Sequence, residues 1–150
     1  MKKLASLILL SAIATLSGPA MAQFAKAEDA IKYRQSALFV MQQNFGRIAA
    51  MAAGRAPLDA KVAAESAEVA TYMSKLPWAA FGEGTDKGAP TKAKAEIWSN
   101  KAKFNDYAEK MQGEMNKLNA AAKTGNLDSI KAAVGAASGS CKTCHDAFRS

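Results

Sequence analysis

Hydrophobic residues recur at alternating spacings of three and four positions in four separate stretches of the chain. This spacing places their side chains on one face of a helix, whereas the alternation typical of a half-buried strand occurs nowhere in the sequence. The four stripes, each with few polar interruptions, are Ile31, Arg34, Leu38, Met41, Phe45, Ile48, Ala52; Val62, Ser66, Val69, Met73, Leu76; Ile97, Lys101, Phe104, Ala108, Met111, Met115, Leu118, Ala122; and Leu127, Ile130, Val134, Ala137, Cys141, Cys144, Phe148. The pattern predicts an all-α protein with four helices of about 18 to 25 residues.

Residues that stop or cap helices bound these stretches. The stops are Gly54 with Pro57, Pro77 and Gly125, and the expected N-caps are Asp59 and either Asn126 or Asp128. The segment 77–90 holds too many glycine and proline residues for a helix, so we expect one long loop there. Short links join the first helix to the second and the third to the fourth, which predicts an antiparallel four-helix bundle.

The first 22 residues have the pattern of a secretory signal peptide. Lys2 and Lys3 precede an apolar run over residues 4–16, and Ala20-Met21-Ala22 gives the small-x-small pattern of a cleavage site. The run is too short to span a bilayer, which needs about 20 apolar residues, and no later segment is apolar enough to replace it. We therefore expect cleavage after Ala22, export of residues 23–150 as a single domain, and no membrane span.

Charge adds little to this picture. The chain carries a formal charge of +7, of which Lys2 and Lys3 contribute two, so residues 23–150 carry +5. A basic balance can indicate a nucleic-acid partner, but here the lysines alternate with acidic residues and no basic cluster contains aromatic side chains. We expect a solvated surface of mixed charge and no nucleic-acid partner.

The two cysteines lie close together at the end of the last stripe, in the sequence Cys141-Lys142-Thr143-Cys144-His145. C-x-x-C-H is the pattern of covalent haem attachment, in which two thiols add to the haem vinyl groups and the adjacent histidine ligates the iron. Residues three apart on a helix share a face, so both sulfur atoms can reach one edge of the porphyrin. His145 is the only histidine of the chain, which leaves a mixed-ligand zinc site short of partners. The remaining alternatives are a plain disulfide and a thioredoxin-like dithiol, and the latter would need a strand before the motif.

The sequence 23–150 resembles the cytochrome c′ family along nearly its whole length. The resemblance rests on three elements: the C-x-x-C-H motif near the C-terminus, the run 32–38 (KYRQSAL) and the run 76–82 (LPWAAFG). It implies a four-helix bundle with one haem c per chain, attached through Cys141 and Cys144. It further implies that His145 is the axial ligand of a five-coordinate iron, whose other face is open and lined by apolar side chains.

The resemblance gives Leu38 a particular meaning. In relatives whose iron is six-coordinate, a methionine stands four residues after the arginine that corresponds to Arg34, and this chain has Leu38 there. Leucine cannot donate to iron, so the sixth position stays vacant. Met41, one turn further along the stripe, is the alternative ligand, although its spacing favours a role in core packing. Four aromatic residues are expected as pocket wall or core: Phe45, Trp78, Phe81 and Phe148.

Two arginines complete the predicted site. Arg34 lies on an otherwise apolar stripe and so needs a partner, and the resemblance implies that this partner is a haem propionate. The alternative is that its side chain reaches out to the surface. Arg149 follows His145 by one helical turn, and the resemblance places it at the proximal face of the haem. The alternative is a frayed residue beside the C-terminal Ser150.

These features predict a periplasmic protein that transfers single electrons and binds nitric oxide or carbon monoxide at the vacant position. The alternatives are a six-coordinate electron-transfer cytochrome that uses Met41, and a weak haem enzyme that reduces nitric oxide or peroxide. Enzymatic turnover is disfavoured because the only histidine is already committed to iron. The resemblance also implies a homodimer through the first two helices, which the alanines 49, 53, 63 and 67 would allow to approach closely if they face outward. The redox partner protein is not indicated by the sequence.

Overall fold

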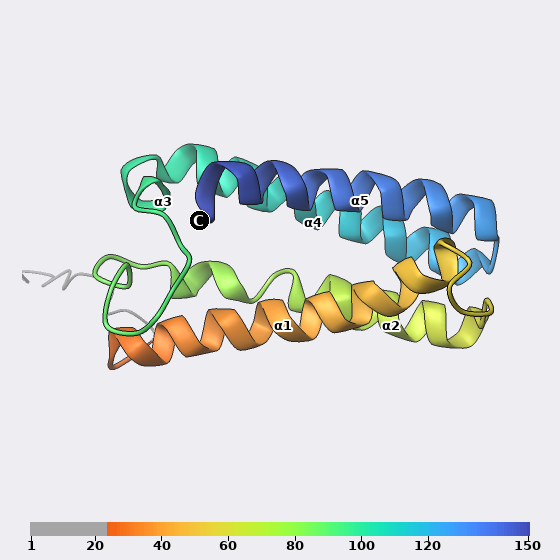
Figure 1. The fold of residues 1–150 in the computed structure, drawn as a ribbon, viewed down its shortest axis with the longest axis horizontal. Coiled ribbons are helices and arrows are strands. Elements are labelled where there is room, and N and C mark those ends of the chain that lie inside the picture. Colours follow the sequence, from red (N-terminus) through yellow and green to blue (C-terminus); the bar gives the residue numbers. More distant parts are fainter. Residues whose placement is uncertain (1–23) are drawn as a thin grey trace, which may run out of the picture.

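A computed structural model describes residues 24–150 as an antiparallel bundle of four long helices (Figure 1). These are α1 (Ala27–Ala52), α2 (Ala60–Met73), α4 (Lys101–Thr124) and α5 (Leu127–Phe148), with a 3-10 turn η1 (Pro77–Ala80) and a short helix α3 (Glu96–Ser99) between α2 and α4. Helix α1 packs on α2, α2 on α4, α4 on α5 and α5 on α1, which closes the bundle. The predicted all-α four-helix bundle is confirmed. The expected signal peptide, residues 1–22, lies outside the described residues.

The helices begin and end largely where the sequence predicts. The Asp59 carboxylate accepts a hydrogen bond of 3.0 Å from the Val62 amide at the start of α2. The Asn126 side chain accepts one of 2.9 Å from the Ser129 amide at the start of α5. Gly125 follows α4 with φ of 66°, the left-handed conformation that a side chain would disfavour. These local signals therefore set the start of α2, the end of α4 and the start of α5.

The third predicted helix is interrupted in the structure. Asn100 (φ −130°, ψ 55°) separates α3 from α4, where the spacing predicts one continuous helix from Ile97. Bonds to the preceding loop hold both sides of the break: Trp98 Nε1 donates to Gly82 O at 2.7 Å, and Lys101 Nζ donates to Phe81 O at 2.7 Å. Tertiary hydrogen bonds here override the local helical pattern.

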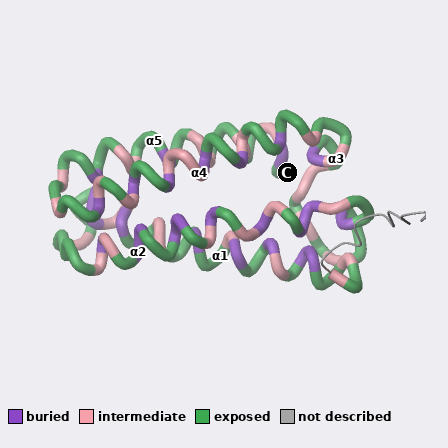
Figure 2. Tube along the Cα trace, turned by 180° about the vertical axis from the view of Figure 1, so that it is seen from behind, coloured by how far each residue is buried: buried purple, intermediate pink, exposed green. Residues whose placement is uncertain are grey.

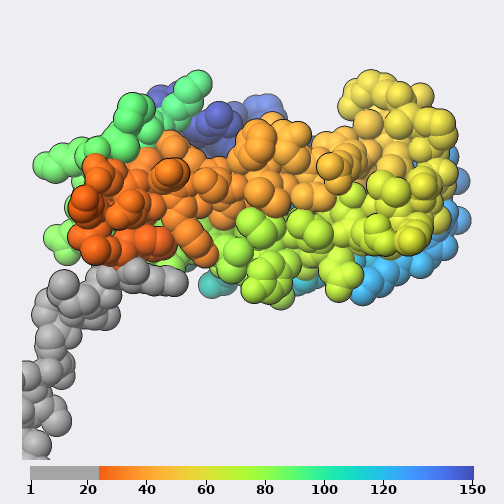
Figure 3. Space-filling model, turned by 90° about the horizontal axis from the view of Figure 1, so that it is seen from below, coloured from red at the N-terminus to blue at the C-terminus, as the bar shows by residue number. Residues whose placement is uncertain are grey.

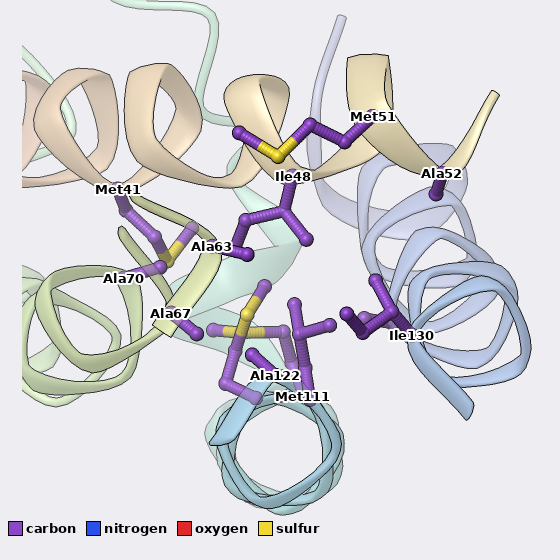
Figure 4. Close-up of a cluster of buried hydrophobic side chains, with 13 residues drawn as sticks. Met41, Ile48, Met51, Ala52, Ala63, Ala67, Ala70, Met111, Ala122 and Ile130 are labelled. Carbon is purple, nitrogen blue, oxygen red and sulfur yellow. The ribbon is translucent and has the colours of Figure 1, made fainter. Parts of the chain in front are cut away.

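The buried face of α2 differs from the prediction. Val69, expected on the inner stripe, is 40% exposed, whereas Ala63, Ala67 and Ala70 have no exposed surface. The prediction that Ala63 and Ala67 face outward is therefore wrong. Small side chains let α2 lie close to its neighbours, and the long side chains of Met111 and Met115 on α4 belong to the same buried cluster as Ala67 (Figure 4).

Two clusters of buried side chains form the core along the inner faces of the helices (Figure 2). The central cluster contains 13 buried residues of the four main helices, among them Met41, Ile48 and Met115. The aromatic cluster comprises Phe81, Ile97, Phe104 and Phe148. It lies toward the end of the bundle where the chain terminates, beside the last turns of α5. None of the helices in residues 24–150 combines the length and the apolar character needed to cross a membrane.

Candidate haem site

The two cysteines occupy the inner face of α5 where the two clusters meet. Cys141 packs against the central cluster and Cys144 packs against the aromatic cluster. Both thiols are free and half-buried, and they are separated by one helical turn. His145 follows directly and is more exposed than either cysteine. The predicted placement of both sulfur atoms on one helix face is therefore seen in the structure.

The surroundings keep these three groups uncharged near neutral pH. Burial raises the pKa of the Cys141 and Cys144 thiols, and for Cys144 the neighbouring Cys141 raises it further. Burial lowers the pKa of His145, as does the positive charge of Arg149, while Asp146 acts weakly in the opposite sense. A neutral imidazole is the form that binds a metal, so His145 is ready to act as a ligand.

Apolar side chains around the motif remain incompletely covered by protein. Leu38 and Phe45 of α1 are only partly buried, and both pack on the same central cluster as Cys141. Trp78 is also partly buried and contacts both clusters, so it links the surroundings of Cys141 and Cys144. A flat, largely apolar macrocycle bound at the two sulfur atoms would cover such surfaces. The residues present therefore fit a covalently bound haem.

Met41 lies within the core rather than at its edge. It is buried in the central cluster, and its side chain points from α1 toward Ala70 of α2 (Figure 4). Leu38, by contrast, is half-buried at the margin of this cluster. The packing of Met41 supports the interpretation that it fills the core, as the helix spacing predicts.

Arg34 is almost fully buried, with 2% of its surface exposed. Its Nη1 donates to Ala80 O at 2.9 Å and to Thr85 Oγ1 at 3.0 Å. Its Nη2 donates to Thr85 O at 2.9 Å and to Thr91 Oγ1 at 3.3 Å. The alternative that Arg34 reaches the surface is therefore wrong. In this structure the guanidinium joins α1 to the loop over residues 80–91.

Aromatic rings complete the environment of this guanidinium. Its central carbon lies 4.4 Å from the centre of the Phe81 ring and 5.7 Å from that of the Trp98 ring. Burial lowers the pKa of Arg34, and Asp86 opposes this shift. Sequence reasoning missed the two threonine partners of Arg34, because hydroxyl residues in a glycine-rich loop carry no distinctive pattern. The only signal was the arginine itself, which needs partners on an apolar stripe.

Arg149 is held in place by its backbone. Its amide donates to His145 O at 2.9 Å, and the residue then turns out of the helix into an extended conformation (φ −127°, ψ 131°). There it forms an isolated antiparallel bridge with Ala93. The alternative that Arg149 is a frayed terminal residue is therefore wrong, although its side chain is exposed.

Comparison with known proteins identifies the family. The sequence model of the family described as Cytochrome C′ matches residues 29–149. The chain belongs to the cytochrome c′ family. A cytochrome c′ from Rubrivivax gelatinosus is 54% identical over 127 residues, covering 85% of this chain and 98% of the relative. A cytochrome c′ from Alcaligenes xylosoxydans xylosoxydans is 50% identical, with the same coverage of both chains.

Solved structures of cytochrome c′ share this bundle. The crystal structure of the Rubrivivax gelatinosus protein superimposes with a TM-score of 0.83 at 54% identity, covering 85% of this chain and all of that chain. A nitric oxide complex of a variant cytochrome c′ from Alcaligenes xylosoxidans superimposes with a TM-score of 0.79 at 48% identity, covering 85% of this chain and 98% of that chain. Members of the family carry covalently bound haem c, and Cys141 and Cys144 are the two cysteines of this chain. The family is generally one of haem proteins without enzymatic turnover.

Proposed function

We propose that residues 23–150, after removal of residues 1–22, form a periplasmic cytochrome that transfers single electrons and binds nitric oxide or carbon monoxide. The haem is attached through Cys141 and Cys144, and His145 is its axial ligand. The observation that carries the proposal is the placement of the half-buried C-x-x-C-H motif on α5, which packs on α1, the helix of Leu38. The nitric oxide complex of a relative with the same fold supports the choice of ligand.

The haem supplies reversible one-electron chemistry and an iron position open to small gases. The neutral imidazole of His145 would ligate the iron, and the hydrocarbon of Leu38 would restrict access to small apolar molecules. Met41 stays in the core beside Ala70 and leaves that position vacant. Because the chain has a single histidine, no second imidazole is present to move protons, so peroxide or nitric oxide reduction is slow.

The optical spectrum of the ferrous protein tests this function. The expected result is a high-spin spectrum for the protein alone. Nitric oxide and carbon monoxide, each added to a separate sample, should shift this spectrum in different ways. A low-spin spectrum that neither gas changes would overturn the proposal in favour of simple electron transfer with a sixth protein ligand.

Replacing Leu38 by methionine is expected to convert the iron to a low-spin, six-coordinate form. The new thioether stands at the position used by six-coordinate relatives, so carbon monoxide must compete with it and its apparent affinity falls by about tenfold or more. The measurement is the ferrous spectrum with a carbon monoxide titration. Met41→Leu is the matched control and should leave the spin state unchanged, whereas a rise in spin state in this control would identify Met41 as the ligand.

We further propose that two copies of the chain associate through α1 and α2. These helices pack on each other and carry four exposed large apolar side chains, Phe39 and Val40 on α1 and Val69 and Tyr72 on α2. Figure 3 shows α1 and α2 side by side on one face of the molecule. Phe39 is 59% exposed and Tyr72 is 65% exposed, which is unusual for large apolar side chains outside an interface. Aromatic residues are the side chains most often found at the centres of interfaces, which supports a second copy of the chain as the partner.

The double variant Phe39→Lys, Val69→Lys is expected to weaken the dimer by about 30-fold or more, because it places charges at the centre of an apolar contact. Sedimentation equilibrium over a range of protein concentrations measures the change. A control with the same added charge, Ala102→Lys with Ala120→Lys on the exposed face of α4, should behave like the wild type. A wild-type mass that stays monomeric at all concentrations would contradict the dimer.

A further inference from the structure

The last three residues of the chain are bound to the segment that precedes α3. Lys94 N donates to Phe148 O at 3.0 Å, and Ser150 N donates to Lys92 O at 3.0 Å, on either side of the bridge between Ala93 and Arg149. Ser150 Oγ adds a bond of 3.3 Å to Lys92 O. Figure 1 shows the C-terminus lying beside this segment. We call the two paired segments, residues 91–94 and 148–150, the C-terminal clasp.

The clasp is itself anchored to α1. Thr91 Oγ1 accepts a hydrogen bond of 3.3 Å from Arg34 Nη2 and one of 3.2 Å from Ala93 N. Just before it, Pro90 O accepts a bond of 3.0 Å from Gln35 Nε2. Thr91 therefore connects the buried guanidinium of Arg34 to the strand-like segment that pairs with Arg149.

The clasp acts on residues directly next to the haem motif. Helix α5 ends at Phe148, three residues after His145, so the bonds of the clasp hold the backbone that follows the helix. Lys94 also reaches back to the motif, because its Nζ donates to Asp146 O at 3.1 Å. Without these bonds, Arg149 would have only its amide bond to His145 O to fix its position.

We propose that the C-terminal clasp positions Arg149 beside His145, with Thr91 and Ser150 as the positioning residues, so that the guanidinium charge acts on the iron centre. This inference rests on the proposed haem ligation by His145. A cation held near the iron favours the ferrous state, because reduction adds one negative charge to the site. A loosened clasp therefore lowers the reduction potential in the same direction as removal of the Arg149 charge.

Ser150→Pro tests the clasp with little risk to folding. Proline removes both donors of Ser150, and the extended backbone of Arg149 is the conformation that a following proline favours. Ser150→Gly is the matched control because it keeps the amide donor. In the haem-loaded protein, amide hydrogen exchange at Lys94 should become faster in Ser150→Pro and change much less in Ser150→Gly. Unchanged exchange in Ser150→Pro would show that the clasp does not hold the terminus.

Thr91→Val tests the connection to α1. Thr124→Val is its matched control, since Thr124 Oγ1 accepts from the amide two residues ahead just as Thr91 does, at the opposite end of the bundle. Thr91→Val should speed exchange at Lys94 and Ser150 and lower the potential, whereas Thr124→Val should do neither. Equal effects of the two variants would show that Thr91 acts only as a turn residue, and would overturn its role as a positioning residue of the clasp.

A double-mutant cycle on the reduction potential decides whether the clasp acts through Arg149. Ser150→Pro should reproduce at least about half of the potential change caused by Arg149→Ala, and cause almost no change in the Arg149→Ala background. Equal changes in both backgrounds would overturn the proposal. Nitric oxide titration of the same proteins tests the vacant iron position separately. A wild-type protein that does not bind the gas would contradict the vacant position, whereas the measured reduction potentials would still test the role of the clasp.

Discussion

Replacing Arg34 by alanine is expected to lower the free energy of unfolding by about 3–5 kcal/mol. The change removes four hydrogen bonds and two ring contacts of a fully buried guanidinium. It also leaves Ala80 O and the Thr85 backbone without their charged donor, and hydrogen bonds to charged groups are worth more than neutral ones. Urea denaturation of the haem-loaded protein, followed by circular dichroism, measures the loss.

The other arginines provide controls for this variant. Arg47 on α1 and Arg55 just after it are both exposed, so each change to alanine should alter stability by no more than about 0.5 kcal/mol. Arg34→Lys keeps the charge but cannot make the forked set of bonds, and should fall between the wild type and Arg34→Ala. A stability of Arg34→Ala equal to that of Arg47→Ala would show that Arg34 does not organise the loop over residues 80–91.

Replacing both Cys141 and Cys144 by alanine is expected to abolish covalent haem attachment. Each thiol adds its sulfur to one carbon of a vinyl group and its hydrogen to the other, and the chain has no further cysteine to substitute. A haem stain on a denaturing gel should therefore lose its signal completely, while each single variant keeps one attachment.

Thr143→Ala is the control for the cysteine variants, because Thr143 lies between the cysteines with its hydroxyl bonded to Gly139 O on the exposed side of α5. It should retain full staining. Haem that stays attached in the double cysteine variant would contradict the assignment. A purified wild type that contains a disulfide and no haem would instead support the disulfide alternative.

Much of the fold could be predicted from local patterns. The three-four spacing of large apolar residues predicted the four helices, because residues at this spacing share one face of a helix. Asp59, Asn126 and Gly125 marked helix ends correctly, since capping needs only a side chain or a left-handed residue at one position. The C-x-x-C-H motif placed both thiols on one face for the same local reason.

Features that depend on tertiary contacts could not be predicted in this way. On α2, Val69 is more hydrophobic than the alanines, so a pattern based on hydrophobicity places it in the interior. Close packing of the helices instead buries the alanines. The break at Asn100 depends on bonds to Gly82 and Phe81, which are distant in sequence. The partners of Arg34 and of Arg149 likewise lie on a loop whose course no periodic pattern describes.

The alanines of α2 also determine how the sequence of this core can drift. A side chain larger than a methyl group at Ala63, Ala67 or Ala70 would push α2 away from its neighbours, and such overpacking typically costs about 1–3 kcal/mol. Exchange of a facing methionine, such as Met111 or Met115, for leucine typically costs less than about 1.5 kcal/mol. Neutral substitutions in this core are therefore expected mainly at the long side chains of α4. The alanines of α2 can be replaced by larger residues only when a facing side chain of α4 is replaced by a shorter one.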